Sequence, residues 1–366
     1  MTMDKRSKTY NFNAGPTALP QEVLEEAQRD LLDYKGSGMS IMEMSHRSKT
    51  YEEVHNEVTS LLKELLNIPD DYHLLYLQGG ASLQFAMVPM NFLGKDQTAG
   101  YILTGSWSEK ALKEAQILGN TKVIASTKEN HYKHIPALSE LHFSDDLAYV
   151  HLTSNNTIYG TQWKAFPDTG QIPLIADMSS DILSRPIDVN QFALIYAGAQ
   201  KNLGPSGVTL VILHKNLLEK AEENLPTMLK YSTHAKNNSL YNTPPTFGIY
   251  MLGLVAKWVK KQGGLEAIAR KNEEKAALIY EAIDESDGFY VGHAEQNSRS
   301  LMNITFRLRD EELEKKFLEE AKEKGFVGLN GHRSVGGCRA STYNAVTLAS
   351  CQALREFMFD FQKRHQ

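Results

Sequence analysis

The sequence predicts an α/β fold in which a large domain, built on a mainly parallel seven-stranded sheet flanked by helices, is followed by a smaller α+β domain. Two features support this fold class. Over roughly the first two-thirds of the chain, short apolar runs alternate with segments of helical spacing and are separated by Gly or Pro, which is the pattern of repeated β-α units. After Gly263 and Gly264 this alternation stops and longer charged segments follow.

Seven apolar runs are expected to form the strands of the large sheet. They lie at 74–77, 101–103, 122–125, 148–152, 174–176, 193–196 and 208–213. Helical spacing follows the first two runs, over residues 83–92 and 108–118. Runs that are apolar throughout are typical of strands in a mainly parallel sheet.

The last part of the chain is expected to be mostly helical. Residues 265–284 show an amphipathic pattern rich in Ala, Glu and Lys. Residues 301–308 alternate like a half-buried strand, with Met302, Ile304 and Phe306 on one face. Two further helices are expected, at 311–324 and 346–362.

These patterns divide the chain into three parts. We expect a large domain over residues 16–260 and a small domain over residues 261–366. Residues 1–15 precede the first regular helix that the pattern predicts, and we expect them to form an arm that packs on the small domain or on a partner.

Composition and charge exclude several classes of protein. The 366 residues carry a formal net charge of −5 and are 42% hydrophobic, which gives no reason to expect nucleic acid as a partner. The longest uncharged apolar stretch, residues 244–256, is shorter than the ~20 residues that cross a bilayer, and the start lacks the apolar core of a signal peptide. Cys338 and Cys351 form neither a CxxC pair nor a metal-binding spacing. We therefore expect a reduced, cytoplasmic protein with no membrane partner and no metal.

Lys201 is the first candidate for a catalytic residue. It follows the predicted strand 193–196 in the segment Ala-Gly-Ala-Gln-Lys-Asn-Leu-Gly-Pro-Ser-Gly that ends at Gly207, where small residues leave room for a bulky planar ligand. At the mouth of a buried sheet, desolvation lowers the pKa of a lysine, as a Schiff-base nucleophile requires. The alternative is an ordinary lysine of a surface loop.

Asp177 is the second candidate. It lies at the carboxyl end of the predicted strand 174–176, and ligands of open α/β sheets bind at that edge. A carboxylate there can pair with the pyridine nitrogen of pyridoxal phosphate (PLP) and keep it protonated, which makes the ring an electron sink. The alternative is an N-cap for the following turn, which Ser179 and Ser180 would assist.

Three more segments follow predicted strand ends. Residues 79–82, Gly-Gly-Ala-Ser, form a strand–turn–helix junction whose backbone N–H groups can bind a phosphate, although many such turns bind nothing. Trp107 can stack on a pyridine ring or be a core or rim aromatic. The polar segment 153–160 can bond a ring oxygen of a cofactor or simply form a turn.

Together these segments resemble fold-type I PLP enzymes of the class-V aminotransferase group and, within it, the phosphoserine aminotransferase family. The resemblance runs from about residue 10 to the C-terminus. It implies the fold-type I architecture, PLP held as a covalent Schiff base on Lys201, and a homodimer with shared active sites. The segments that carry it are Asn11–Thr17, Met44–Ser48, Leu103–Trp107, Ala197–Gly207, Tyr241–Thr246 and Gly331–Ser341.

The resemblance also implies roles for individual residues around the cofactor. Lys201 would move the substrate proton, Asp177 would hold the pyridinium, Trp107 would stack on the ring and Thr157 would bond the ring hydroxyl. Some family members carry an arginine in the loop where this chain has Ala-Ser, so the cofactor phosphate would depend more on N–H groups and hydroxyls. The residues that would hold this phosphate are Ala81, Ser82, Gln200 and, from the other subunit, Asn242 and Thr243.

A substrate with an anionic side chain needs several cations, and arginine binds carboxylate and phosphate bidentately. By resemblance, Arg339 would bind the α-carboxylate. The phosphate or side-chain carboxylate would be bound by His332 and Arg333, and by His46 and Arg47, which we expect to come from the partner subunit. The alternative for each is a solvated surface charge, which the Gly-rich surroundings of His332 and Arg333 disfavour.

These roles imply reversible transfer of an amino group from L-glutamate to 3-phosphohydroxypyruvate, giving O-phospho-L-serine and 2-oxoglutarate, a step of serine biosynthesis. 4-Phosphohydroxythreonine is a second candidate substrate. One alternative is another class-V reaction such as cysteine desulfuration, but neither Cys338 nor Cys351 is placed as a free nucleophile. The other is a non-catalytic PLP-binding regulator, which would not need both Asp177 and Lys201.

Overall fold

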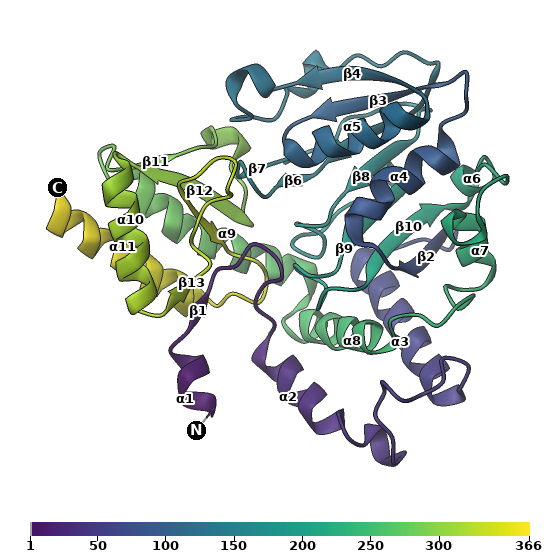
Figure 1. Ribbon diagram of the computed structural model, residues 1–366, viewed down its shortest axis with the longest axis horizontal. Coiled ribbons are helices and arrows are strands. Elements are labelled where there is room, and N and C mark those ends of the chain that lie inside the picture. Colours follow the sequence, from purple (N-terminus) through teal and green to yellow (C-terminus); the bar gives the residue numbers. More distant parts are fainter. Residues whose placement is uncertain (1) are drawn as a thin grey trace.

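The central feature of the computed structural model is a seven-stranded sheet with the order β2-β10-β9-β8-β5-β3-β4 (Figure 1). The structure describes residues 2–366, so Met1 of the predicted arm lies outside the described residues. Each of the seven predicted runs falls on one strand of this sheet, and the predicted fold class is confirmed. The strands are β2 Tyr72–Leu77, β3 Thr98–Leu103, β4 Asn120–Ser126, β5 Leu147–Thr153, β8 Leu174–Asp177, β9 Leu194–Gly198 and β10 Thr209–His214.

Neighbouring strands pair in parallel except β10, which runs antiparallel to both β9 and β2. The parallel strands bring their carboxyl ends to one edge, where ligands of such sheets bind. The chain reverses directly after β9, and Ala199 N donates to Val208 O at 2.9 Å across the turn. This turn carries Lys201, so the lysine is anchored between two central strands.

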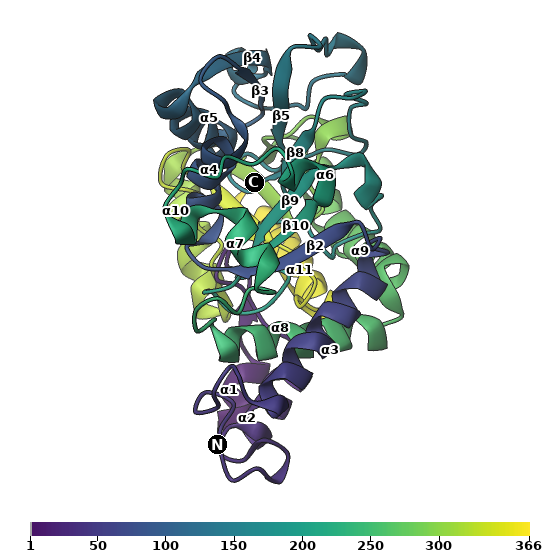
Figure 2. The same ribbon diagram turned by 90° about the vertical axis from the view of Figure 1, so that its right-hand side faces the viewer.

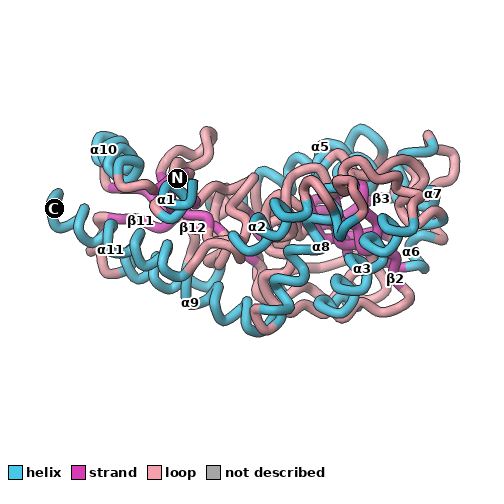
Figure 3. Tube along the Cα trace, turned by 90° about the horizontal axis from the view of Figure 1, so that it is seen from below, coloured by secondary structure: helices cyan, strands magenta, loops and turns pink. Residues whose placement is uncertain are grey.

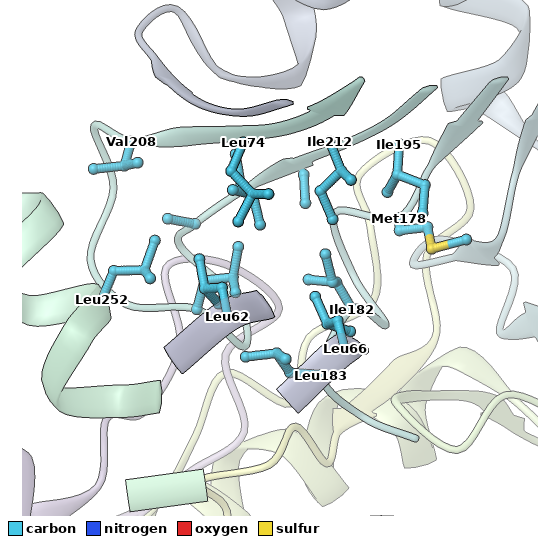
Figure 4. Packing of buried hydrophobic residues seen from close by; sticks show 14 of the residues in the cluster. Leu62, Leu66, Leu74, Met178, Ile182, Leu183, Ile195, Val208, Ile212 and Leu252 are labelled. Atoms are coloured by element: carbon cyan, nitrogen blue, oxygen red, sulfur yellow. The ribbon is translucent and has the colours of Figure 1, made fainter. Parts of the chain in front are cut away.

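Helices cover both faces of the sheet. Alternate residues of β2 divide between the faces: Leu75 and Leu77 pack with α4 and α5, whereas Leu74 and Tyr76 pack with α3 and α8. Figure 4 shows Leu62 of α3 facing the sheet beneath Leu74. The helices of the large sheet are α2 Gln21–Asp30, α3 Lys49–Leu66, α4 Gly80–Phe92, α5 Ser106–Leu118, α6 Lys215–Leu218, α7 Tyr231–Lys236 and α8 Thr246–Lys261.

Helices α2, α3 and α8 were not predicted from the sequence. Helix α3 begins at Ser48, whose side chain accepts a hydrogen bond from Tyr51 N, and ends at Asn67 in the left-handed conformation. It packs closely on α8 because Gly253 has no side chain: a Cβ there would lie 2.6 Å from Val58 Cγ2. The apolar stretch 244–256 is thus the buried helix of this pair.

The C-terminal part has its own sheet and its own hydrophobic cluster. The three-stranded antiparallel sheet consists of β11 Tyr290–Gly292, β12 Asn303–Leu308 and β14 Cys338–Ser341. Helices α9 Gly264–Asp284, α10 Glu311–Glu323 and α11 Leu348–His365 accompany it. Figure 3 shows these elements at one end of an elongated molecule and the large sheet at the other.

Strand β12 is buried on both faces rather than one, and only Arg307 is exposed. The prediction of a half-buried strand is therefore wrong. The second face is covered because the site segment packs on it: Thr305 Oγ1 donates to Ile158 O at 3.0 Å, and Asn155 Nδ2 donates to Asn303 Oδ1 at 2.8 Å. Segment 155–162 itself forms the short strands β6 Asn155–Asn156 and β7 Thr161–Gln162.

The N-terminal arm contains regular structure that the sequence did not predict. A short helix, α1 Thr2–Ser7, is followed by β1 Tyr10–Asn11, which pairs in parallel with β13 Phe326–Val327. The arm therefore packs on the C-terminal part of its own chain, and Phe12 joins that hydrophobic cluster. The domain division at residues 260 and 261, which falls in the last turn of α8, stays a prediction.

Candidate active site

A cavity of about 280 Å³ opens at the carboxyl edge of the parallel strands and gathers residues from distant parts of the chain. Most of the predicted site residues line it: Ala81, Ser82, Trp107, Thr157, Asp177, Gln200, Lys201, His332 and Arg339. The predicted residues outside its lining are His46, Arg47, Asn242, Thr243 and Arg333. Of these, all except Arg333 were expected to act at the partner's site.

Lys201 lies in the turn between β9 and β10, and its side chain extends into this cavity. Burial lowers the pKa of the Lys201 ammonium; Asp177 opposes this effect and Arg339 adds to it. The backbone of the arm lies against the lysine stem at Gly15, where a Cβ would be 3.5 Å from Lys201 Cε. Because Gly15 has φ +149°, a side chain at this position would also be strained.

Asp177 is the last residue of β8 and is buried beside the lysine turn. Its Oδ1 accepts a hydrogen bond from Ser179 N at 2.9 Å, so the capping role considered for the sequence exists in the structure. Burial nevertheless raises the pKa of the Asp177 carboxyl, because the bonds from Ser179 and the charge of Lys201 compensate only in part. The carboxylate is open to a cationic partner.

Asp181, four residues later, provides the contrast. Its carboxylate accepts hydrogen bonds from Ser154 Oγ and, at 3.1 Å, from Gln162 Nε2. Arg185 also lies within 3.9 Å. Asp181 is thus a structural carboxylate with its own partners, whereas Asp177 faces the cavity.

Trp107 and Arg339 are held in place through Thr157. Trp107 Nε1 donates to Thr157 Oγ1 at 2.9 Å, and Arg339 Nη1 donates to Thr157 O at 2.8 Å. The Thr157 hydroxyl keeps its own proton for a further bond. One residue therefore fixes an aromatic wall and a cation on the same cavity.

The glycine turn after β2 leads directly into α4, which begins at Gly80, three residues before the predicted start. Gly79 has φ +88° and occupies the N-cap position. Ala81 and Ser82 consequently lie in the first helical turn, where backbone N–H groups have no partner within the helix. This end of the cavity favours an anion.

Some residues of the cavity were not predicted individually. Thr153, Asn155 and Ile158 belong to the polar segment after β5 that the sequence singled out, and Ser179 and Ser180 follow Asp177. Ala14 and Gly15 come from the arm, and nothing in their local sequence places them here. Within residues 2–366, no group of His, Cys, Asp and Glu side chains is arranged to hold a metal, and no helix has the length and apolar content to cross a membrane.

Comparison with known families agrees with this geometry. The family described as class-V aminotransferase matches residues 9–354, which include every predicted site residue. The chain therefore belongs to the class-V aminotransferase family.

Individual relatives narrow the assignment. The chain is 69% identical over 359 residues to a phosphoserine aminotransferase of Lysinibacillus sphaericus, covering 98% of this chain and 99% of the relative. For that of Bacillus subtilis the identity is 59%, with the same coverage. A solved phosphoserine aminotransferase from Bacillus circulans subsp. alkalophilus superimposes with a TM-score of 0.97 at 60% identity, covering 98% and 99% of the two chains. A PLP-bound phosphoserine aminotransferase from Trichomonas vaginalis gives 0.91 at 39% identity, covering 96% and 99%. The chain therefore belongs to the phosphoserine aminotransferase family, as predicted.

Proposed function

We propose that the protein transfers an amino group reversibly between L-glutamate and 3-phosphohydroxypyruvate, giving O-phospho-L-serine and 2-oxoglutarate. One observation carries this proposal: the half-buried Lys201 and the buried carboxylate of Asp177 share a cavity with His332 and Arg339, in a chain of the phosphoserine aminotransferase family. The same recognition of a phosphorylated side chain would admit 4-phosphohydroxythreonine as a second substrate.

The residues of the cavity fit PLP as the cofactor. Asp177 is a buried carboxylate open to a cation such as a pyridinium, and Lys201 is a half-buried amine whose pKa is lowered by desolvation. The N–H groups at the start of α4 suit the cofactor phosphate, with Gln200 beside them and Asn242 and Thr243 from the partner subunit. When bound through Lys201, PLP supplies the electron sink for the carbanion formed at the substrate Cα.

The chain supplies proton transfer and orientation. Burial lowers the pKa of Lys201, which favours its neutral form, and as a free amine Lys201 Nζ would take the α-proton of the substrate and pass it to the cofactor. With PLP bound, Asp177 would keep a proton on the ring nitrogen, and the Thr157 hydroxyl would orient the ring. The Trp107 indole covers the site and excludes water.

The substrate is held by cations at the outer side of the cavity. Arg339, already fixed by Thr157 O, binds the α-carboxylate. His332 and Arg333, joined by His46 and Arg47 of a second subunit, bind the phosphate or the side-chain carboxylate of glutamate. The two substrates can then use one site in turn.

The surface of the chain supports a homodimer. Large apolar side chains are exposed in the segment that leads to His46 and Arg47: Leu32 is 85%, Met42 55% and Met39 45% exposed. This segment, between α2 and α3, extends away from the sheet (Figure 2). Tyr241, next to Asn242, is also exposed. If these apolar side chains are buried against a second copy of the chain, His46 and Arg47, together with Asn242 and Thr243, would lie close to the partner's active site.

The cysteines argue against desulfuration. Both are free and buried. Burial raises the pKa of the Cys351 thiol to about 12 and that of Cys338 also well above its usual range. Neither can supply the thiolate that desulfuration needs. Free thiols also fit a cytoplasmic protein.

The proposal is tested on the purified holoenzyme. With glutamate and 3-phosphohydroxypyruvate, we expect stoichiometric O-phosphoserine and 2-oxoglutarate, measured by mass spectrometry. Glutamate alone should change the visible absorption of the bound cofactor, and 3-phosphohydroxypyruvate, but not pyruvate, should reverse the change. Efficient amination of pyruvate with no product from 3-phosphohydroxypyruvate would refute the assigned substrate while leaving the aminotransferase class intact.

A further inference from the structure

Trp107 contacts a lysine that has no role in the function proposed above. Lys110 lies one turn after Trp107 on α5, and its Nζ is 4.3 Å from the centroid of the indole ring. Trp107 lines the cavity, so Lys110 contacts a residue of the cavity wall without lining the cavity itself. Its side chain is exposed, and it makes no ion pair with any residue from 2 to 366.

The charge of Lys110 acts on the substrate side of the cavity. The pKa of His332 is lowered, first by burial and then by the positive charges of Arg339, Arg333 and Lys110. His332 and Arg339 line the cavity, and Arg333 and Lys110 lie close enough to act on His332, in a protein whose net charge is −5. Such a concentration of positive charge attracts an anion.

The neighbouring carboxylate does not neutralise Lys110. Glu109 accepts hydrogen bonds from Lys128 Nζ at 2.6 Å and from Tyr132 OH at 2.8 Å, so its carboxylate already has partners other than Lys110. The contact of Lys110 with the indole is a cation–π interaction at an exposed site, which is weak enough to give way to an anion. The ammonium is thus held near the mouth but left without a counter-charge.

We propose that Lys110 binds the phosphate group of the substrate at the cavity mouth and so favours phosphorylated over unphosphorylated keto acids. This inference rests on the proposed function, because it names one more residue at the same substrate site. A doubly charged phosphate needs more positive charge than a carboxylate, and a lysine on a flexible stem can reach it without a fixed geometry.

Matched variants test the proposal. Lys110→Met keeps most of the apolar stem and removes the charge, and Lys110→Arg keeps the charge. Lys113→Met removes an equally exposed lysine from the next turn of the same helix. For Lys110→Met we expect KM for 3-phosphohydroxypyruvate to rise about three- to tenfold, the size of one ionic contact at a partly exposed site, with kcat little changed. Lys110→Arg should restore KM, and Lys113→Met should leave it unchanged.

A second measurement separates this inference from the proposed function. Binding of inorganic phosphate to the holoenzyme, measured by calorimetry, needs no turnover and should weaken in Lys110→Met by the same factor as KM. If the holoenzyme has no aminotransferase activity, this measurement still decides the phosphate site. Unchanged phosphate binding overturns the proposal. So does an equal loss for glutamate and 3-phosphohydroxypyruvate together with faster loss of PLP, since Lys110 would then act only by supporting Trp107.

Discussion

The inner and outer walls of the cavity are built differently. The inner wall consists of strand ends and a tight turn of the central sheet, and it carries the buried Asp177 and the half-buried Lys201. The outer wall is the loop 331–337 between β13 and β14, which carries His332 and the exposed Arg333. Chemistry on a cofactor needs fixed groups, whereas substrates must enter and leave. The inner wall is therefore suited to holding the cofactor, and the outer wall to admitting and releasing the substrates.

The outer loop, residues 331–337, is held in shape by backbone hydrogen bonds between its own residues. Gly331 N donates to Gly337 O at 2.8 Å, and both Val335 N and Gly336 N donate to His332 O. From outside the loop, the Arg307 guanidinium donates to Val335 O. The loop is thus attached to the small sheet through the one exposed residue of β12.

The largest expected effect is at the inner wall. Lys201→Ala should lower formation of O-phosphoserine by at least about a thousandfold, because the group that carries the cofactor and moves the proton is lost. Borohydride reduction of the wild-type holoenzyme followed by peptide mass spectrometry should place the cofactor on Lys201. The exposed Lys113→Ala variant is the control, and a label on any other lysine would contradict the assignment.

Asp177→Asn should lower activity by at least about a hundredfold, because the amide cannot keep the cofactor nitrogen protonated. In the apoprotein the same variant should be more stable than the wild type at neutral pH. The pKa of Asp177 is raised in the folded state, so its stability contribution is complete below the ordinary carboxyl pKa of about 3.9 and is lost as pH rises through the folded pKa. Thermal unfolding of both apoproteins across pH measures this.

The control for Asp177 is Asp181→Asn. Burial raises the pKa of Asp181 as well, but Ser154 and Gln162 donate to its two different oxygens and an amide keeps only one acceptor. Asp181→Asn should therefore stabilise the apoprotein at neutral pH less than Asp177→Asn does. If Asp181→Asn stabilises the apoprotein as much as Asp177→Asn or more, the distinction between an open and a satisfied carboxylate is wrong.

The smallest expected effect is at the outer wall. Arg307→Gln should raise KM for 3-phosphohydroxypyruvate by about two- to fivefold and speed amide hydrogen exchange in residues 332–337, because the loop loses an external hydrogen bond. The affinity for PLP should not change. Arg309→Gln is the matched control, since Arg309 bonds His365 O instead of the loop. Slower or unchanged exchange in Arg307→Gln would rule out this attachment.

The sequence predicted the inner wall better than the outer parts of the site. Lys201 and Asp177 each follow an apolar run, and strand ends of a parallel sheet converge on one edge whatever the remaining details. Helix α8 is apolar on nearly all sides, so its periodicity does not distinguish it from a buried strand. Helix α3, in contrast, has Ser48 as its N-cap and a regular apolar spacing, so its sequence does indicate a helix.

Other features of the structure cannot be predicted from the local sequence. The pairing of β1 with β13 joins short strands far apart in the sequence, and no periodicity in either segment indicates it. The contacts of Lys110 with Trp107 and of Arg307 with Val335 depend on where long side chains extend. Such contacts follow from the assembled fold rather than from the spacing of residues.

The arm sets an order of events during protein synthesis. Ala14 and Gly15 cover the lysine turn, and the arm is held by β13 and by Tyr343, whose hydroxyl donates to Ala14 O although it follows 329 residues later. A nascent chain that has passed β10 already contains Lys201 and Asp177, but the cover over them cannot form. Residues 14 and 15 must wait for residues near position 343 before Tyr343 can hold them in place, so the cover over Lys201 is completed late in folding.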